Sequence, residues 1–418
     1  MTQILDHYIS AAPLQSSSLS PATYGFNATL SAQRAAFQQN CLSELVLKVA
    51  SRCNLDCDYC YMYTMADSGW KQQERIMSLV TAERIARRVA DYAHAHNLHA
   101  FDIIFHGGEP LLAGAEQLSQ MTELFRTHAP DVQFSFSMQT NGTLLTSAAL
   151  STLSAAHIMV GVSLDGTRAA NDRHRLYSNG KSSYAAASEG LRLLADEYRQ
   201  LFGGVLAVMD LAADPLETFG ALNTHRPPSI DFLFPLAHHS NPPAAGYGAW
   251  LAEIFDYWSQ ADVAFVPDVR LFHIIIDLLL GRSTRAGFIG ASPDTLSAVI
   301  QPDGSAELLD ALKSTTGTAT YTGLNVHSSS LDTIAAHPGY RQPVPALTCW
   351  NCDLFKVCGG GYYTHRWSQT NGFDNPSVYC DELKTLITHI QRKVQHGEAE
   401  SPGDAQHFRA GHPDDRSH

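Results

Sequence analysis

The sequence predicts an α/β fold built around a parallel sheet, because strand-length apolar runs alternate with helix-length segments through most of the chain. Between the first two runs, Ile85, Val89 and Tyr92 recur at the spacing of one helix face. The candidate strands are residues 45–49, 103–105, 134–138, 158–162, 205–209 and 230–234. Further helices are expected at residues 115–127, 146–155, 185–195 and 215–222. Such a repeat fits a doubly wound sheet or a barrel, since periodicity does not separate the two.

The remaining segments are assigned from composition and spacing. Residues 1–42 are rich in Ser, Ala and Gln, which predicts an N-terminal arm that is partly disordered. The β/α repeats occupy residues 43–265, and the helical patterns at 247–259 and 271–280 predict a helical bridge that extends over 266–296. A smaller cysteine-bearing domain is expected over 297–395, followed by a polar, disordered tail at 396–418.

Composition excludes several classes of function. The chain has 418 residues, of which 44% are hydrophobic, enough for a sizeable core. Its formal net charge is −13, so we expect no general affinity for nucleic acid or for an anionic membrane. The N-terminus has no basic segment followed by an apolar run, and no apolar stretch is long enough to cross a bilayer. We therefore expect a soluble cytoplasmic protein.

Three cysteines directly after the first predicted strand, Cys53, Cys57 and Cys60, carry the clearest chemical information in the chain. Their spacing, Cys-x3-Cys-x2-Cys, places three thiolates on one tight loop. A 4Fe–4S cluster held by three thiolates keeps one iron without a protein ligand. Open coordination of this kind is what a catalytic site needs, because a substrate or cofactor must bind there. A structural zinc site is the alternative interpretation.

Four more cysteines, Cys349, Cys352, Cys358 and Cys380, gather near the C-terminus, which leaves Cys41 as the remaining one of the eight. Clustered cysteines in a cytosolic protein indicate metal binding rather than disulfides. Four thiolates complete a 4Fe–4S site and leave no open position. A zinc ribbon that uses the same four residues is the alternative.

Polar or glycine residues follow the second, third and fourth predicted strands, at the edge of the sheet where β/α folds place their active sites. Adjacent glycines allow a ligand to approach the backbone, and the carboxylate that follows them offers an acceptor for an ammonium group. The glycine, asparagine and aspartate residues also occur in ordinary turn sequences, and Arg175 also fits a solvated basic face. The candidates are Gly107, Gly108, Glu109, Asn141, Ser163, Asp165 and Arg175.

The cysteine triad followed by Tyr61, with the Gly-Gly-Glu turn one β/α unit later, resembles the radical SAM signature. The resemblance implies an incomplete (β/α)6 TIM barrel whose open iron is chelated by S-adenosylmethionine (SAM). It further implies that Gly107, Gly108 and Glu109 hold the SAM amino group and that Tyr61 contributes backbone contacts to the adenine. Polar groups at the later strand ends would bind the ribose hydroxyls and the carboxylate, and these groups are Asn141, Ser163, Asp165 and Arg175.

The C-terminal cysteines resemble the second auxiliary-cluster half of a SPASM domain, a module common in peptide-modifying radical SAM enzymes. A full SPASM domain has further cysteines where this chain has Leu309 and Tyr362, so we expect one auxiliary cluster instead of two. In the similar sulfatase-maturing enzymes, an aspartate that matches Asp310 is the proposed catalytic base. Here it could equally cap a turn or pair with Lys313.

Residues 163–174, 210–215, 358–366 and 372–380 look like the FxsB-type radical SAM/SPASM maturases. That resemblance implies an oxidoreductase that acts on a ribosomally synthesised precursor peptide (RiPP biosynthesis). A 5′-deoxyadenosyl radical would lead to a cyclophane, a C–C crosslink between an aromatic ring carbon and a β-carbon of a nearby residue. The cofactors would be SAM, a SAM-binding 4Fe–4S cluster and one auxiliary 4Fe–4S cluster. An electron donor such as flavodoxin or ferredoxin would be a further partner.

Other functions remain compatible with the residues alone. One is a different peptide modification, such as a thioether crosslink, epimerisation, or formylglycine formation as in sulfatase maturation. A second is a radical SAM enzyme that acts on a small molecule, and a third is a non-catalytic scaffold that binds zinc or a cluster.

We predict about eight irons per chain after anaerobic reconstitution, since seven of the eight cysteines would hold two 4Fe–4S clusters. Replacing Cys53, Cys57 and Cys60 together by Ala should remove about half of this iron, as a colorimetric iron assay would show. A content near twelve irons would contradict the inference drawn from Leu309 and Tyr362.

Overall fold

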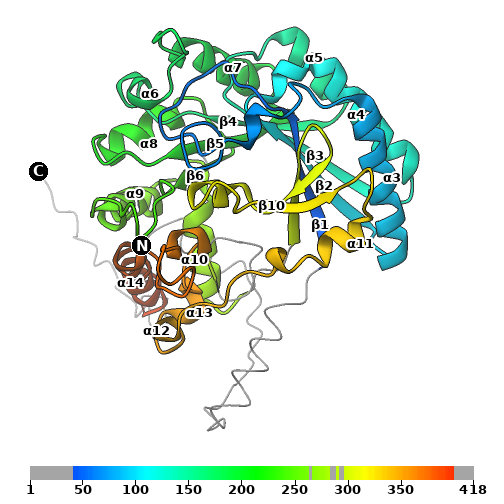
Figure 1. Ribbon diagram of the computed structural model, residues 1–418. Helices are drawn as coiled ribbons and strands as arrows, with labels where there is room; N and C mark the ends of the chain where they lie inside the picture. The colour runs from blue at the N-terminus through cyan, green and yellow to red at the C-terminus, as the bar shows by residue number, and fades with distance from the viewer. Residues whose placement is uncertain (1–40, 263–265, 283–288, 291–295, 400–418) are drawn as a thin grey trace, which may run out of the picture.

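The computed structural model describes residues 41–262, 266–282, 289–290 and 296–399, and its strands form one ten-stranded sheet (Figure 1). The strand order is β10-β9-β8-β1-β2-β3-β4-β5-β6-β7. The bounds are β1 Leu42–Ala50, β2 Ala100–Gly107, β3 Gln133–Thr140, β4 Ile158–Ser163, β5 Phe202–Val208, β6 Ser229–Leu233, β7 Asp268–Val269, β8 Leu296–Ile300, β9 Ser305–Glu307 and β10 Tyr321–Asn325.

Most of the sheet is parallel, which confirms the α/β fold predicted from the sequence. Each of the six predicted apolar runs overlaps one of the strands β1–β6, and these pair in chain order. The sheet stays open because β1 pairs with β2 on one side and with β8 on the other, in parallel in both cases. Among the described strands, the antiparallel pairs are β8–β9 and β9–β10.

Helices cover the outer face of the curved sheet, as Figure 1 shows for α3, α4, α5, α7 and α8. Helix α3 illustrates why these segments fold as they do. Ser78 caps its first turn by accepting a hydrogen bond from the Thr81 backbone N–H, and Ile85 and Val89 bury its apolar face. The bounds are α3 Leu79–His96, α4 Ala115–His128, α5 Ser147–Ala155, α6 Arg168–His174, α7 Tyr184–Asp196 and α8 Pro215–Asn223.

The C-terminal part of the chain adds a second group of helices. Helices α9, α10 and α14 pack against one another beyond β6 and β7 (Figure 1). Strands β8–β10 belong to the predicted cysteine-bearing domain, yet they extend the same sheet through β1. The remaining bounds are α9 Tyr247–Gln260, α10 Arg270–Leu279, α11 Leu331–Ala335, α12 Leu347–Trp350, α13 Phe355–Cys358 and α14 Cys380–Ala399.

The short 3-10 helices connect these elements, and their bounds are η1 Gly69–Lys71, η2 Pro110–Ala113, η3 Arg199–Leu201, η4 Asp310–Ser314, η5 Pro338–Tyr340 and η6 Tyr363–Arg366. The predicted N-terminal arm and C-terminal tail lie almost wholly outside the described residues. Within the described part of the chain, no helix combines the length and the apolar character needed to span a membrane.

A buried carboxylate ties the end of β2 to the end of β3. Glu109 is fully buried, and its Oε1 accepts hydrogen bonds from the Leu111 N–H (3.0 Å) and the Thr140 hydroxyl (2.7 Å). Its Oε2 accepts from the Asn141 N–H at 2.8 Å. These bonds fix the turns that follow both strands, and therefore position the residues on these turns relative to each other.

Glu109→Gln should destabilise the protein by about 1–3 kcal/mol, because an amide NH2 would replace one of two oxygens that both face donors. Thermal and chemical unfolding would measure this loss. Glu123→Gln on α4 is the matched control, since that side chain is 66% exposed, and it should change stability by less than about 0.5 kcal/mol. Equal stability of Glu109→Gln and the wild type would contradict the structural role of this carboxylate.

Candidate functional site

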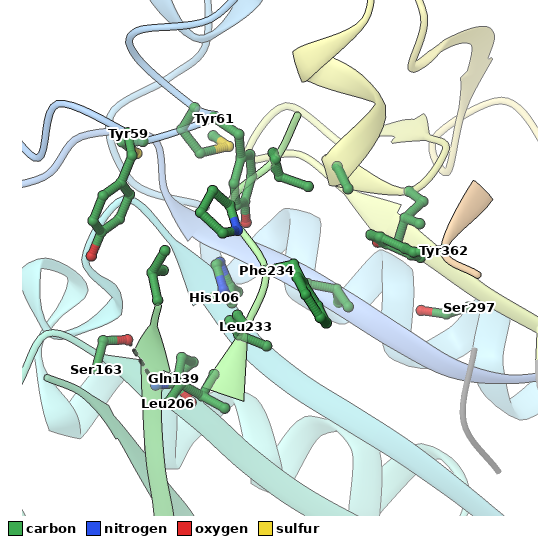
Figure 2. A pocket seen from close by; sticks show the side chains of 18 of the residues that line it. Tyr59, Tyr61, His106, Gln139, Ser163, Leu206, Leu233, Phe234, Ser297 and Tyr362 are labelled. Carbon is green, nitrogen blue, oxygen red and sulfur yellow. Dashed lines mark hydrogen bonds between the residues drawn. The ribbon is translucent and has the colours of Figure 1, made fainter. Parts of the chain in front are cut away.

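The curved sheet encloses a cavity of about 770 Å³, lined by the loop after β1, by the ends of β2–β6 and by residues of the C-terminal segment. Cys53, Cys57 and Cys60 contribute to one part of its wall. Tyr362 and Ser297 lie at a different part of the cavity from Tyr59 and Tyr61, as Figure 2 shows. The volume falls in the range of cofactor and substrate sites.

The loop with the first three cysteines is folded tightly by its own backbone. The Cys60 N–H donates to the Cys57 carbonyl at 3.1 Å, and the Thr64 N–H donates to the Cys60 carbonyl at 2.9 Å. The Asp56 N–H donates to the carbonyl of Leu176 at 2.8 Å, which anchors the loop to the segment after α6. All three predicted ligands therefore face one cavity from one ordered loop.

The electrostatics of these thiols fit a group that supplies positive charge. Burial raises the pKa of Cys53 to about 12, and Glu109, Cys57 and Cys60 add to the shift by repulsion. Burial likewise raises the pKa of Cys57 to about 11. A metal reverses this effect, because coordination stabilises the thiolate form. Within the described ranges, no group of three or more Cys, His, Asp or Glu side chains is arranged to hold a metal ion.

The two glycines after β2 allow close packing against the cysteine loop. A Cβ atom on Gly107, whose φ is +150°, would lie 2.2 Å from the Ala50 carbonyl oxygen. A Cβ on Gly108 would lie 2.3 Å from the Arg52 carbonyl oxygen. Both glycines line the cavity, so a ligand there can reach the backbone. Glu109 lies behind them and is not among the cavity-lining residues, and its predicted contact with an ammonium group stays a prediction.

A chain of polar side chains links the cysteine loop to β4. Arg175 donates from Nη1 to the Tyr59 hydroxyl at 2.8 Å, and that hydroxyl donates to Asp165 Oδ2. Asp165 Oδ1 accepts from the Val208 N–H at 3.0 Å, and burial raises the pKa of this carboxyl against the opposing Arg175. Sequence reasoning identified Asp165 and Arg175 but missed Tyr59, although its place between Cys57 and Cys60 was a signal.

The other predicted SAM contacts also line the cavity. Asn141 donates from Nδ2 to Asn54 Oδ1 at 2.8 Å, and the same nitrogen lies 3.7 Å from Cys53 Sγ. Ser163 accepts a hydrogen bond from Gln139 Nε2 at 2.9 Å (Figure 2). Tyr61 is partly buried beside the Lys48 ammonium, which lies 5.5 Å from the ring centroid. Seven of the eight predicted cofactor-binding residues thus meet at one site, with Glu109 behind it.

A buried ionic network lies beneath Tyr61. Lys48, fully buried on β1, forms an ion pair with Asp310 and donates to His106 Nδ1 at 3.0 Å. Burial and the neighbouring ammonium lower the pKa of His106 to about 3, so its imidazole is neutral. The second carboxylate oxygen of Asp310, Oδ1, is buried and has no hydrogen-bond partner. Lys313, the alternative partner from the sequence, pairs with Glu307 instead, at 2.6 Å.

The four C-terminal cysteines also come together. Burial raises the pKa of Cys358 to about 11, and the thiols of Cys380, Cys349 and Cys352 add to this by repulsion. The residues come from α12, the segment that follows it, the end of α13 and the start of α14. As with the loop cysteines, they are close enough to repel one another without converging on a single ion. Cys41 lies apart as an exposed free thiol.

The chain is similar to known proteins over most of its length. The cysteine-type anaerobic sulfatase-maturating enzyme of Clostridium novyi is 25% identical over 83% of this chain and 94% of its own. The serine-type anaerobic sulfatase-maturating enzyme of Klebsiella aerogenes is 26% identical over 77% of this chain and 79% of its own.

Solved structures share the fold. Native anSMEcpe with bound AdoMet superposes with a TM-score of 0.72 at 22% identity, covering 86% of this chain and 100% of that chain. Streptococcus suis SuiB bound to precursor peptide SuiA gives a TM-score of 0.53 at 15% identity, covering 87% and 83% of the two chains. Residues 47–210, which contain the loop cysteines and the Gly-Gly-Glu turn, match the family model of the radical SAM superfamily.

Proposed function

We propose that this protein is a radical SAM enzyme that modifies a ribosomally synthesised precursor peptide and forms a cyclophane crosslink between an aromatic ring carbon and a nearby β-carbon. The observation that carries the proposal is the lining of the cavity by Leu309 and Tyr362. In this proposal both stand where the resemblance to a full SPASM domain implies cysteine ligands, and the space of a second auxiliary cluster would belong to the cavity instead. An aromatic side chain of a peptide fits a wall of this kind, which also contains Tyr363 and Tyr379.

A peptide substrate is supported by the relatives. The similar enzymes of Clostridium novyi and Klebsiella aerogenes are named for sulfatase maturation, a modification of a protein chain. Two structures of the same fold hold peptides: native anSMEcpe with the Cp18Cys peptide, and SuiB with precursor peptide SuiA. Formylglycine formation in a sulfatase is therefore the second candidate function, favoured by the identity of 25–26% over most of the chain.

The residue roles follow from the positions in the cavity. In this proposal Cys53, Cys57 and Cys60 hold the SAM-binding cluster, and the four C-terminal cysteines hold the auxiliary one. When bound, these groups supply a radical that removes a hydrogen atom and an acceptor for one electron. Tyr59, Asp165 and Arg175, of which the last two are buried, form a polar wall that orients the polar end of SAM and excludes water.

Asp310 remains the proposed proton acceptor. Its charge is near enough to raise the pKa values of two partly buried phenols: that of Tyr61, where desolvation is the main cause, and that of Tyr362, where desolvation and Tyr363 contribute more. The ion pair with Lys48 fixes one oxygen and leaves Oδ1 without a partner. A ring that has formed the new C–C bond must lose one electron and one proton to become aromatic again, and Oδ1 is the proposed base for that proton.

The function is tested by anaerobic incubation of the enzyme, SAM and dithionite with the precursor peptide encoded beside its gene. Tandem mass spectrometry should show a peptide that has lost two hydrogens and does not fragment between the crosslinked residues. The Cys53→Ala/Cys57→Ala/Cys60→Ala variant should leave the peptide unchanged.

Three controls separate the alternatives. A product that reacts with an aldehyde reagent would identify formylglycine, and a lost free thiol would identify a thioether. An unchanged mass with an altered residue configuration would identify an epimer. Any of these results would contradict the cyclophane proposal but would still support an enzyme that modifies a peptide.

Asp310→Asn should lower the yield of crosslinked peptide by about two to four orders of magnitude, because the amide cannot accept the proton. Hydrogen abstraction precedes this step, so deuterium from a labelled β-carbon should still appear in 5′-deoxyadenosine. The double variant Lys48→Met/Asp310→Asn removes both buried charges and controls for the unpaired ammonium. Asp332→Asn, on an exposed side chain of α11, should leave the yield unchanged. Wild-type crosslinking in Asp310→Asn would eliminate this residue as the base.

A further inference from the structure

Arg366 is a large, buried, charged side chain near the C-terminal cysteines. It is only 2% exposed and lies at the end of η6. Nη2 donates to the carbonyl of Pro343 at 2.8 Å, whereas Nε and Nη1 are buried without any hydrogen-bond partner. A guanidinium in this state is costly, since a buried charge normally has both a counter-charge and hydrogen bonds.

The groups that would favour the charge of Arg366 include two of the C-terminal thiols. Burial lowers the pKa of Arg366 to about 10, and the groups that oppose this effect are Cys349, Tyr363, Cys358 and Asp374, in that order. No ion pair joins Arg366 to Asp374 or to any other carboxylate within the described residues. The backbone favours the approach as well: Gly360, at φ +88°, would place a Cβ 3.8 Å from Arg366 Nη1, so the chain between Cys358 and Arg366 turns closely around the guanidinium.

We infer that Arg366 is the internal counter-charge of the auxiliary cluster, and that its free Nε–H and Nη1–H groups donate toward the cluster held by Cys349, Cys352, Cys358 and Cys380. This inference rests on the proposed auxiliary cluster. A closed cluster with four thiolates is anionic and gains one more negative charge when it is reduced. A buried cation therefore stabilises the reduced form more than the oxidised form, and raises the reduction potential.

The chain offers a matched control on the solvent side of the same thiols. Lys384, on the first turns of α14, is close enough to Cys380 for the thiol to raise the pKa of its ammonium. Its side chain is 51% exposed, so solvent and salt screen its charge. Arg366 and Lys384 carry the same charge beside the same group of four cysteines, but among the described residues Arg366 is buried without an ion pair, whereas Lys384 is exposed and lies 3.6 Å from Asp381.

The test uses the full chain with Cys53→Ala, Cys57→Ala and Cys60→Ala, so that the auxiliary cluster is the only one present. Dithionite and redox mediators set the potential, and electron paramagnetic resonance measures the reduced cluster at each potential. The titration gives the midpoint potential. Arg366→Met should lower the reduced-to-oxidised ratio at a fixed potential by at least about tenfold, which is about 59 mV for a one-electron couple. Arg366→Lys keeps the charge, so its reduced-to-oxidised ratio should stay within about threefold of that in the background protein. The ratio in Lys384→Met should stay within about twofold.

The outcomes separate the inference from the proposed function. If the triple alanine background binds no iron, the auxiliary cluster is wrong and the role of Arg366 falls with it. If the cluster forms and Arg366→Met changes its reduced-to-oxidised ratio at a fixed potential by less than about twofold, the inference is overturned and the cluster stands. Loss of iron in Arg366→Met with retention in Arg366→Lys would support the counter-charge. Equal loss in both variants would show that Arg366 only packs, and would overturn the inference.

Discussion

The ion pair between Lys48 and Asp310 is the interaction on which the rest of the site depends. It joins the middle of β1 to η4, and therefore holds the C-terminal segment against the sheet that carries the cysteine loop. Lys48 is fully buried, so removing one partner would strand a charge at a cost of about 3–5 kcal/mol. A pair of this kind fixes position more than it adds stability, and here it places Asp310 near both Tyr61 and Tyr362.

This connection explains how the C-terminal segment comes to form part of the cavity wall. The loop thiols and the polar group of Tyr59, Asp165 and Arg175 line the cavity from the sheet, and Tyr362 lines it from the C-terminal segment. Buried charges that lack a full set of partners, Asp310 and Arg366, mark the places where the chain alone is electrostatically incomplete. In the proposed function, Asp310 would accept a proton from the substrate, and an anionic cluster would supply the missing counter-charge of Arg366.

The sequence predicted the strands β1–β6 and the helices α3, α4, α5, α7 and α8 between them, because those segments bury apolar positions that local spacing reveals, but it did not predict α6. It did not predict that β8 would pair with β1, since that contact joins Leu296 to Leu42 across most of the chain. Tyr59 was missed for a similar reason: its partners Asp165 and Arg175 lie 106 and 116 residues away. The sequence also could not show that three donors already occupy Glu109. Lys48 did carry a signal, as a lysine inside the apolar run of β1, but only the structure shows its partner.

The measurement that tests the central claim most directly is an anaerobic crystal structure of the reconstituted enzyme with SAM and its precursor peptide. The account predicts SAM at Cys53, Cys57 and Cys60 with its polar end beside Tyr59, Asp165 and Arg175. It also predicts an aromatic side chain of the peptide in the cavity between that site and Tyr362, within reach of Asp310. A peptide bound outside this cavity, or a zinc ion at the loop cysteines, would contradict it.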